Sequence, residues 1–166
     1  MTLDLKYPKI IAETRELLAR CLPANRVDVV RKTDGNCVSV SVYSLHLPCL
    51  FPQHAPGKKH ERRIILEPWQ QGLVGLAPGA LLRGLIRSDG CVFVNRTDIH
   101  RPRPYEYLSY EFTNKSADIV GIFVGACEVL GVEYRVTYQS SRGLWSVRIN
   151  RRSSVAIMLE SVGLKQ

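Results

Sequence analysis

The same order of predicted elements occurs twice in the chain, and this repeat restricts the fold more than any other feature. Each copy has apolar residues at helical spacing, followed by two segments that alternate between apolar and polar residues around a turn. The first copy covers residues 8–22, 26–32 and 37–43, and the second covers 116–130, 133–139 and 144–150. A separation of about 107 positions is too long for a solenoid and favours a pseudo-twofold duplication. Chance similarity of two helix–hairpin units is the alternative.

Further elements are predicted between and after these copies. Residues 91–96 and 105–113 predict a hairpin, joined by the basic loop His100–Pro104. Helices are predicted over 67–76, over about 78–88, and over 153–162. The order from residue 78 onward is therefore helix, strand, strand, helix, strand, strand, helix. We predict an α+β fold with an incomplete first half, 1–75, and a complete second half, 76–166.

The helix predicted from residue 78 carries small residues on one side. Ala80, Gly84 and Ser88 are spaced four apart, so a second helix could approach this side closely. Gly84 costs a helix about 1 kcal/mol relative to Ala, and close packing would offset this cost. The helix ends at Asp89-Gly90, where a carboxylate is unfavourable unless a cation lies nearby. The alternatives are an ordinary helix-ending turn and a tolerated glycine in a buried helix.

The segment Leu82-Arg-Gly-Leu-Ile-Arg-Ser-Asp-Gly90 resembles the LAGLIDADG motif of the DOD-type homing endonucleases. The αββαββα order that begins with this helix also resembles the core of that family. The resemblance implies saddle-shaped antiparallel sheets and two motif helices that pack together through Ala80, Gly84 and Ser88. It also implies that Asp89, with Gly90, holds a divalent metal ion such as Mg²⁺ at the scissile phosphates. Arg87 stands where the motif has its earlier acidic residue. In the family, that earlier position does not bind the metal.

A second resemblance covers most of the chain. The stretch Cys49–Arg62, followed by Trp69-Gln70, is similar to a subgroup of bacterial, chiefly actinobacterial, LAGLIDADG-like proteins. Members of that subgroup usually carry two motifs, the first of them upstream of a segment like Thr2–Pro23. The resemblance therefore implies that this sequence lacks the first motif helix and its strand. A homodimer, or a second chain with the missing motif, would then complete the active site.

The charge balance favours a polyanionic partner. The chain has 23 Lys and Arg against 15 Asp and Glu, a formal net charge of +8, as expected for a nucleic-acid-binding protein. A solvated basic surface is the alternative. The five cysteines are scattered without a CxxC pair, and no apolar run resembles a secretory signal or a membrane span. These features predict a cytoplasmic protein that associates with the nucleoid when it is bound to DNA.

Alternation along the predicted strands gives each strand an apolar and a polar side. The apolar side contains Leu108, Tyr110, Phe112, Tyr134, Val136, Trp145, Val147 and Ile149, whereas Ser109, Glu111 and Ser146 lie on the polar side. A mixed polar row of this kind could contact bases in the major groove of double-stranded DNA, with Arg and Lys on phosphates. The predicted DNA contacts are Lys32, Ser39, Ser41, Lys58, Arg62, Arg96, Arg101, Arg103, Tyr105, Tyr107, Arg135, Thr137, Gln139, Arg142, Arg148, Asn150, Arg151 and Arg152. Plain solvent exposure is the alternative for each.

The loop 51–63 is a second candidate for chemistry, because it is rich in basic and amide side chains. The family resemblance implies a lysine and a glutamine close to the scissile phosphate, and we assign these roles to Lys59 and Gln53. A zinc site that uses Cys49, His54 and His60 is the alternative, although their spacing matches no standard zinc motif.

The sequence therefore predicts a Mg²⁺-dependent, site-specific double-strand DNA endonuclease. The main alternative is a DNA-binding transcriptional regulator that keeps the fold but does not cleave. Further alternatives are an RNA-binding protein that assists intron splicing, and a decayed remnant or a partner-binding subunit. Basic charge alone does not separate DNA from RNA.

Overall fold

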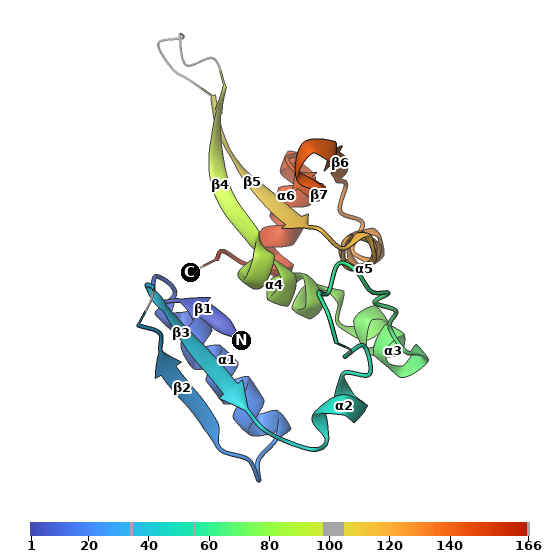
Figure 1. Cartoon of the computed structure of the whole chain (residues 1–166). Helices are drawn as coiled ribbons and strands as arrows, with labels where there is room; N and C mark the ends of the chain where they lie inside the picture. The colour runs from blue at the N-terminus through green and yellow to red at the C-terminus, as the bar shows by residue number, and fades with distance from the viewer. Residues whose placement is uncertain (34, 55, 98–104, 166) are drawn as a thin grey trace. The chain divides into compact units, whose positions relative to one another are not determined.

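A computed structural model describes residues 1–33, 35–54, 56–97 and 105–165 of the chain (Figure 1). The chain forms two compact units, residues 1–54 and residues 55–165. The sequence-based division placed residues 55–75 with the first half. In the structure they join the second unit, because the helix that they contain packs against two helices of that unit.

The first unit is a small three-stranded antiparallel sheet with one long helix. Its elements are β1 (Thr2–Asp4), α1 (Pro8–Cys21), β2 (Val27–Arg31), β3 (Cys37–Val42) and α2 (Leu47–Leu50). The strand order is β1-β3-β2. Leu3, Ile10, Val38 and Val40 form its buried core. Helix α1 and strands β2 and β3 occupy the predicted segments, whereas β1, with three residues, is too short to show a periodicity.

The second unit contains the complete αββαββα order that the sequence predicted. Its elements are α3 (Pro68–Leu76), α4 (Pro78–Asp89), β4 (Gly90–Thr97), β5 (Tyr105–Asn114), α5 (Ala117–Val129), β6 (Arg135–Gln139), the 3-10 turn η1 (Ser140–Arg142), β7 (Leu144–Ile149) and α6 (Arg152–Ser161). The strands form one antiparallel sheet in the order β4-β5-β7-β6. The core order starts at α4 and ends at α6.

The predicted duplication is present in the topology of the two units. The element order β1-α1-β2-β3 of the first unit is the same as β5-α5-β6-β7 of the second. The strand order β1-β3-β2 likewise corresponds to β5-β7-β6. The repeat that the sequence indicated through periodicity alone is therefore a repeat of sheet connectivity.

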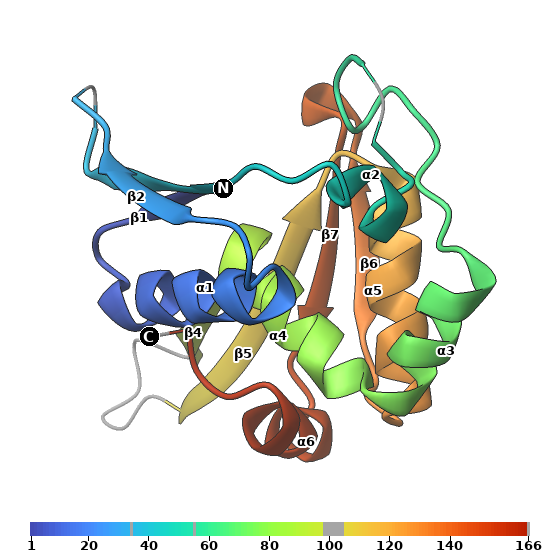
Figure 2. The same ribbon diagram turned by 90° about the horizontal axis from the view of Figure 1, so that it is seen from below.

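Helices α4, α5 and α6 cover one face of the four-stranded sheet (Figure 2). Tyr110, Phe112, Val147 and Ile149 supply the buried side of the sheet, as the alternation predicted. The ring of Phe112 stacks on a ring from α5 with their centroids 4.5 Å apart. The opposite face of the sheet is therefore left for polar residues. No helix in the described ranges is long and apolar enough to cross a bilayer.

Helix α4 has a buried side and an exposed side. Leu82 and Ile86 are buried in the core of the second unit, whereas Ala80, Gly84 and Ser88 are exposed. A methyl group built on Gly84 would meet no described atom within 4 Å. The stripe of small residues is therefore not used within the second unit.

Substitution by alanine should have opposite effects on stability at Gly84, within α4, and at Gly90, at the junction of α4 with β4. A Cβ atom at Gly90 would lie 2.7 Å from Ile86 Cα and 3.0 Å from the carbonyl oxygen of Glu111, and main-chain atoms cannot move cheaply. We expect Gly90→Ala to lower the free energy of unfolding by about 3 kcal/mol.

The matched control Gly84→Ala should instead raise the free energy of unfolding by about 1 kcal/mol, because helical glycine is replaced in open space. Urea denaturation at low protein concentration measures both variants. Equal stability of the two variants would contradict the packing described at the α4–β4 junction.

Candidate metal centre and nucleic-acid interface

The Asp89 carboxylate lies at the C-terminus of α4, where two side chains hold one of its oxygens. Lys59 Nζ lies 3.1 Å from Asp89 Oδ2, and Asn114 Nδ2 donates a hydrogen bond to the same oxygen at 3.0 Å. Among the described side chains and main-chain groups, none donates to Oδ1. The Asp89 side chain is 41% exposed, and this second oxygen is open in the sense that no described group is hydrogen-bonded to it.

Two cations offset the unfavourable position of a carboxylate at a helix C-terminus. Lys59 pairs with the carboxylate itself. Lys165 Nζ donates to the main-chain oxygens of Ser88 at 3.2 Å and Gly90 at 2.8 Å. Cations at this end of a helix interact favourably with its dipole and with its unpaired carbonyl groups. The sequence predicted that a cation must lie near Asp89, but only the structure identifies which ones.

The loop that carries Lys59 is held against α5. The main-chain N–H of Ile64 donates to Asp118 Oδ2 at 2.7 Å, and Asp118 lies in the first turn of α5. Lys58 forms an exposed ion pair with Glu61 at 3.4 Å. Lys59, in this loop, lies beside Asp89, and its assigned role near the scissile phosphate stays a prediction. Gln53 belongs to the first unit, and its role at this site stays a prediction.

The ligands available at Asp89 suit a hard divalent cation. Mg²⁺ is usually held by one or two carboxylates together with water and substrate phosphates, rather than by a closed set of protein ligands. The open Oδ1 oxygen of Asp89 fits such a site. The Gly90 carbonyl, the second predicted ligand, accepts the hydrogen bond of Lys165 and would have to exchange it for the ion.

A zinc site finds less support. Within the described part of the chain, no three His, Cys, Asp or Glu side chains converge as metal ligands. His60 lies 3.8 Å from Glu61, whereas Cys49 and His54 belong to the other unit.

The face of the four-stranded sheet opposite the helices is polar and leads to Asp89. Glu111 is paired across the sheet with Arg148, and Arg148 with Arg135. Glu111 Oε1 accepts hydrogen bonds from Ser146 Oγ at 2.6 Å and from Arg148 Nη2 at 3.0 Å. At the end of this face, the Thr113 hydroxyl lies 3.5 Å from the main-chain oxygen of Asp89. Thr113 is therefore the point at which this face adjoins the main chain of Asp89.

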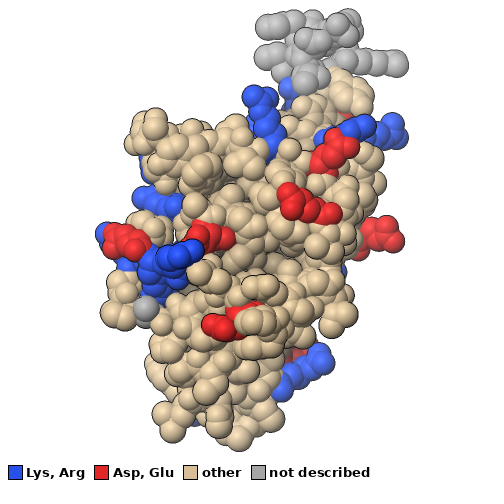
Figure 3. Space-filling model, turned by 90° about the vertical axis from the view of Figure 1, so that its right-hand side faces the viewer, with Lys and Arg blue, Asp and Glu red and all other residues tan. Residues whose placement is uncertain are grey.

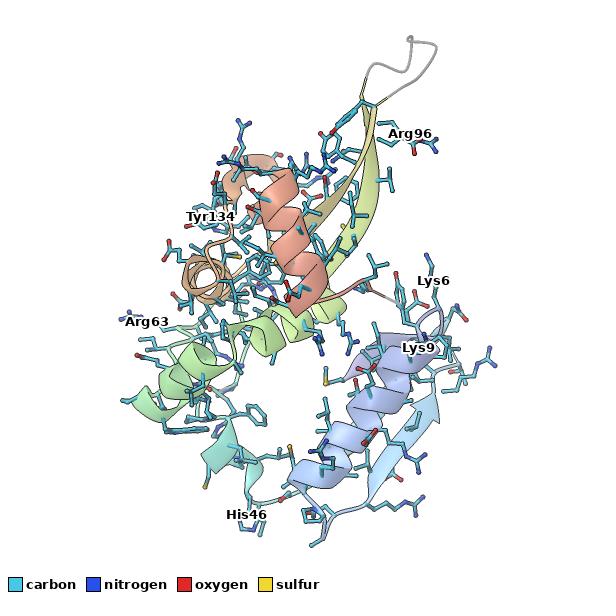
Figure 4. The ribbon with its side chains drawn as sticks, turned by 180° about the vertical axis from the view of Figure 1, so that it is seen from behind. Lys6, Lys9, His46, Arg63, Arg96 and Tyr134 are labelled. Carbon is cyan, nitrogen blue, oxygen red and sulfur yellow. The ribbon has the colours of Figure 1, made fainter. Side chains whose placement is uncertain are left out.

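Several predicted DNA contacts share this polar face of the second unit. By strand register they are Tyr107, Arg135, Thr137, Gln139 and Arg148. Ser109 also lies on this face, but it is buried, and its hydroxyl accepts a hydrogen bond from Asn95 Nδ2 at 2.5 Å. Arg96 lies on the other face, toward the far end of the β4–β5 hairpin, and its Nε pairs with Glu106 Oε1 at 2.7 Å (Figure 4).

A second group of predicted contacts surrounds a hollow beside α6. Its volume is about 780 Å³, and the group comprises Tyr105, Tyr107, Asn150, Arg151 and Arg152. Arg151 forms an ion pair with Glu133 there, which reduces the cost of a cation at the N-terminus of α6. This hollow borders the beginning of β5, whereas Asp89 lies near the end of that strand.

The remaining predicted contacts are distributed over both units. Ser39 and Ser41 are half-buried in β3, and Lys32 is exposed just after β2. Lys58 and Arg62 lie in the loop before α3, and Arg142 lies in the turn between β6 and β7. Arg101 and Arg103 lie outside the described residues. On the face drawn in Figure 3, basic and acidic side chains are interspersed rather than joined in one basic field.

Sequence reasoning missed Asn114 and Lys165. Asn114 accepts a hydrogen bond from the main-chain N–H of Ser116, and the Ser116 hydroxyl caps α5. An Asn two residues before a serine N-cap is a recognisable turn signal, so the position of Asn114 could have been found, although its contact with Asp89 could not. Lys165 is 77 residues from Ser88, whose carbonyl it binds, and no local pattern indicates that contact.

The thiol of Cys91 provides a probe of the polar face. Burial first, and then the negative charge of Glu111, raise the pKa of Cys91 above its ordinary value of 9.0, while Lys165 and Arg148 act in the opposite direction. Cys91 and Glu111 are direct partners in the β4–β5 ladder. The thiolate is therefore disfavoured as long as Glu111 is charged.

We expect Glu111→Gln to lower the pKa of Cys91 and to make its alkylation by iodoacetamide faster at pH 8, because only the thiolate reacts. Mass spectrometry of the peptide that contains Cys91 measures the rate between pH 7 and pH 10. Glu106→Gln, which changes the other face of β5, is the control and should leave the profile unchanged. An identical profile for Glu111→Gln would contradict the electrostatic coupling.

Comparisons with known proteins were made by sequence and by structure. The family model described as a LAGLIDADG-like domain matches residues 77–163, just over half of the chain. A search among curated protein sequences found no significant match.

Solved structures of the homing endonuclease I-DmoI resemble the chain in fold. A structure of its mesophilic variants has a TM-score of 0.61 at 13% identity, and the match covers 98% of this chain and 78% of that one. I-DmoI in complex with DNA and Mn gives 0.57 at 14% identity, covering 92% and 72%. A variant of I-DmoI with one glycine replaced by serine, in complex with its target DNA in the presence of Mg, gives 0.60 at 14% identity, covering 98% and 78%. At these identities the likeness establishes the fold.

Proposed function

Because the chain belongs to the LAGLIDADG-like domain family, we propose that it binds double-stranded DNA and cleaves both strands at a long, specific site with a divalent cation. The observation that carries this proposal is the Asp89 carboxylate. One of its oxygens is held by Lys59 and Asn114, the other is open, and the group lies at the end of the polar sheet face. The protein would act in the cytoplasm, at the nucleoid.

The polar face supports DNA as the ligand. Arg135 and Arg148 are neighbours across β6 and β7, and both are exposed. Thr137 and Gln139 continue the row along β6, which is exposed along its whole length. Arginines can contact phosphates or guanine, and Gln and Thr can contact base edges in the major groove. I-DmoI, whose fold is similar, was solved in complex with its target DNA.

The residues at Asp89 support hydrolysis of a phosphodiester. Asp89, through Oδ1, would hold the cation, and the Gly90 carbonyl is the second candidate ligand. Bound there, Mg²⁺ would lower the pKa of a water molecule and stabilise the negative charge that develops on the phosphate. The Lys59 ammonium, 3.1 Å from Asp89, would bind a phosphate oxygen and offset part of the same charge. Gln53 would orient the water molecule.

Cleavage of two strands needs a second acidic site. Each copy of the motif provides one carboxylate, and the second unit contains one such helix, α4. The exposed stripe Ala80, Gly84 and Ser88 would pack against the equivalent stripe of another motif helix, supplied by a second copy of this chain or by a partner chain. Small residues on both helices allow the close approach that would bring the two Asp89-type carboxylates together.

A DNA-binding regulator without nuclease activity is the second candidate. The observation that favours it is that, within the described residues, no group of three or more His, Cys, Asp or Glu side chains could hold a metal ion. Such a protein would use the same polar face for DNA and would not need a cation.

The two candidates differ in the response to Asp89→Asn. We expect this variant to lose at least about 100-fold in the rate of Mg²⁺-dependent cleavage of supercoiled DNA, because an amide is a poor ligand for the cation. Its affinity for DNA, measured in EDTA, should be unchanged. Gel electrophoresis of the plasmid products and filter binding give the two readouts.

Glu160→Gln, which removes an exposed carboxylate from α6, is the matched control and should cleave like the wild-type protein. Wild-type protein that binds DNA but shows no metal-dependent cleavage would reject the nuclease and support the regulator. Wild-type protein that binds no DNA, or that binds it with an affinity independent of salt, would reject both candidates.

The pairing of motif helices can be tested at Gly84. A leucine at this position would separate two helices that pack through the small residues, so we expect Gly84→Leu to sediment as a monomer under conditions in which the wild-type chain self-associates. Gly121→Leu in α5, where a Cβ also meets no described atom within 4 Å, is the control and should keep the wild-type state. A wild-type chain that is monomeric alone and with DNA would contradict self-association through α4.

A further inference from the structure

Asn114 is the last residue of β5, and it is buried although its side chain is polar. Its exposed fraction is 5%. The side-chain oxygen Oδ1 accepts a hydrogen bond from the main-chain N–H of Ser116 at 2.9 Å, and the side-chain nitrogen Nδ2 donates to Asp89 Oδ2 at 3.0 Å. Both ends of the amide therefore have partners.

The orientation of this amide is fixed by its partners. The N–H group of Ser116 is only a donor, so the oxygen of the Asn114 amide must face it. The nitrogen then necessarily points to Asp89. Ser116 is itself buried and caps α5, where its hydroxyl accepts a hydrogen bond from the N–H of Ile119 at 3.4 Å. The donor that Asp89 receives is consequently anchored in the end of β5 and in the N-terminus of α5.

The two donors to Asp89 differ in how firmly they are held. Lys59 comes from a loop, and its side chain is 53% exposed, so its long chain keeps considerable freedom. Asn114 is buried on a strand and tied at both ends. A carboxylate that accepts a hydrogen bond from a fixed donor loses the freedom to rotate, and its other oxygen then points in one direction.

We infer that Asn114 is a positioning residue for Asp89: it holds Oδ2 and thereby keeps Oδ1 directed outward for a divalent cation. The binding of a cation to Oδ1 rests on the proposed function. The contact between Asn114 and Asp89 is independent of that function. Asn114 also follows Thr113, whose hydroxyl lies at the end of the polar face. DNA bound on that face would therefore contact β5 one residue away from the group that orients the acid.

The contact is tested first without metal or DNA. In the wild-type protein the side-chain NH₂ group of Asn114 should give well-separated nuclear magnetic resonance signals, and these should shift in Asp89→Ala, which removes the acceptor. In Thr113→Val, which retains the Asp89 carboxylate, the signals should shift less. Side-chain amide signals that are identical in wild type and Asp89→Ala would overturn the inference.

The effect on the cation is tested by titration of the whole chain with Mn²⁺ in the presence of uncleavable target-length DNA, using calorimetry. Asn114→Ser keeps a short acceptor for the N–H of Ser116 but cannot reach Asp89. We expect it to weaken Mn²⁺ binding about 10-fold, as is typical when a residue that orients a metal ligand is removed. Glu160→Gln, on α6, should bind Mn²⁺ as the wild type does, and Asp89→Asn should not bind it at this site.

Folding is checked in parallel, because a buried residue is changed. If Asn114→Ser is unfolded by circular dichroism, Asn114→Thr provides the second variant, since its hydroxyl retains an acceptor for the N–H of Ser116 and cannot reach Asp89. It should lose the ordered Asp89 orientation in a crystal structure, and retention of that orientation would overturn the inference. A folded Asn114→Ser that binds Mn²⁺ like wild type would also overturn it.

If the Asn114 signals respond to Asp89→Ala but wild type binds no Mn²⁺, the proposed metal-dependent function fails while the contact stands.

Discussion

The junction between α4 and β4 has no room for a side chain at Gly90, and the placement of the candidate site depends on this close contact. The chain changes there from helix to strand within one residue, between the main chain of Ile86 and the carbonyl of Glu111. Glu111 lies on the polar face of β5. The same junction therefore packs α4 on the sheet and brings Asp89, the preceding residue, to the end of the polar face.

The electrostatics of the site follow from that placement. A carboxylate at the C-terminus of a helix is opposed by the helix dipole, so the fold must supply compensation from elsewhere. It does so with Lys59 from the loop before α3, Lys165 from the residues after α6, and the amide of Asn114. The result is an exposed acid that lies beside two lysines and a side-chain amide.

Much of the fold could be predicted from local patterns. The helix 78–88, the hairpin 91–96 and 105–113, and the alternation of Tyr110 and Phe112 were recognisable because helices and strands repeat over near neighbours. The burial of Ser109 could not be predicted in this way, because it depends on how β5 pairs with the adjacent strand β4. Arg96 and Arg148 are both arginines in predicted strands. They lie on opposite faces of the sheet, because Arg96 is paired with Glu106 and Arg148 with Glu111.

The sequence by itself determined the order of elements, the repeat, and a helix with small residues that ends at an acid and a glycine. Each of these is encoded within a few positions of the chain. Only the tertiary structure decided which groups surround Asp89. Lys59 and Asn114 are 30 and 25 residues away, and Lys165 lies at the other end of the αββαββα core. Contacts over such separations arise when the helices pack on the sheet, and side-chain chemistry alone does not specify which residues that packing brings together.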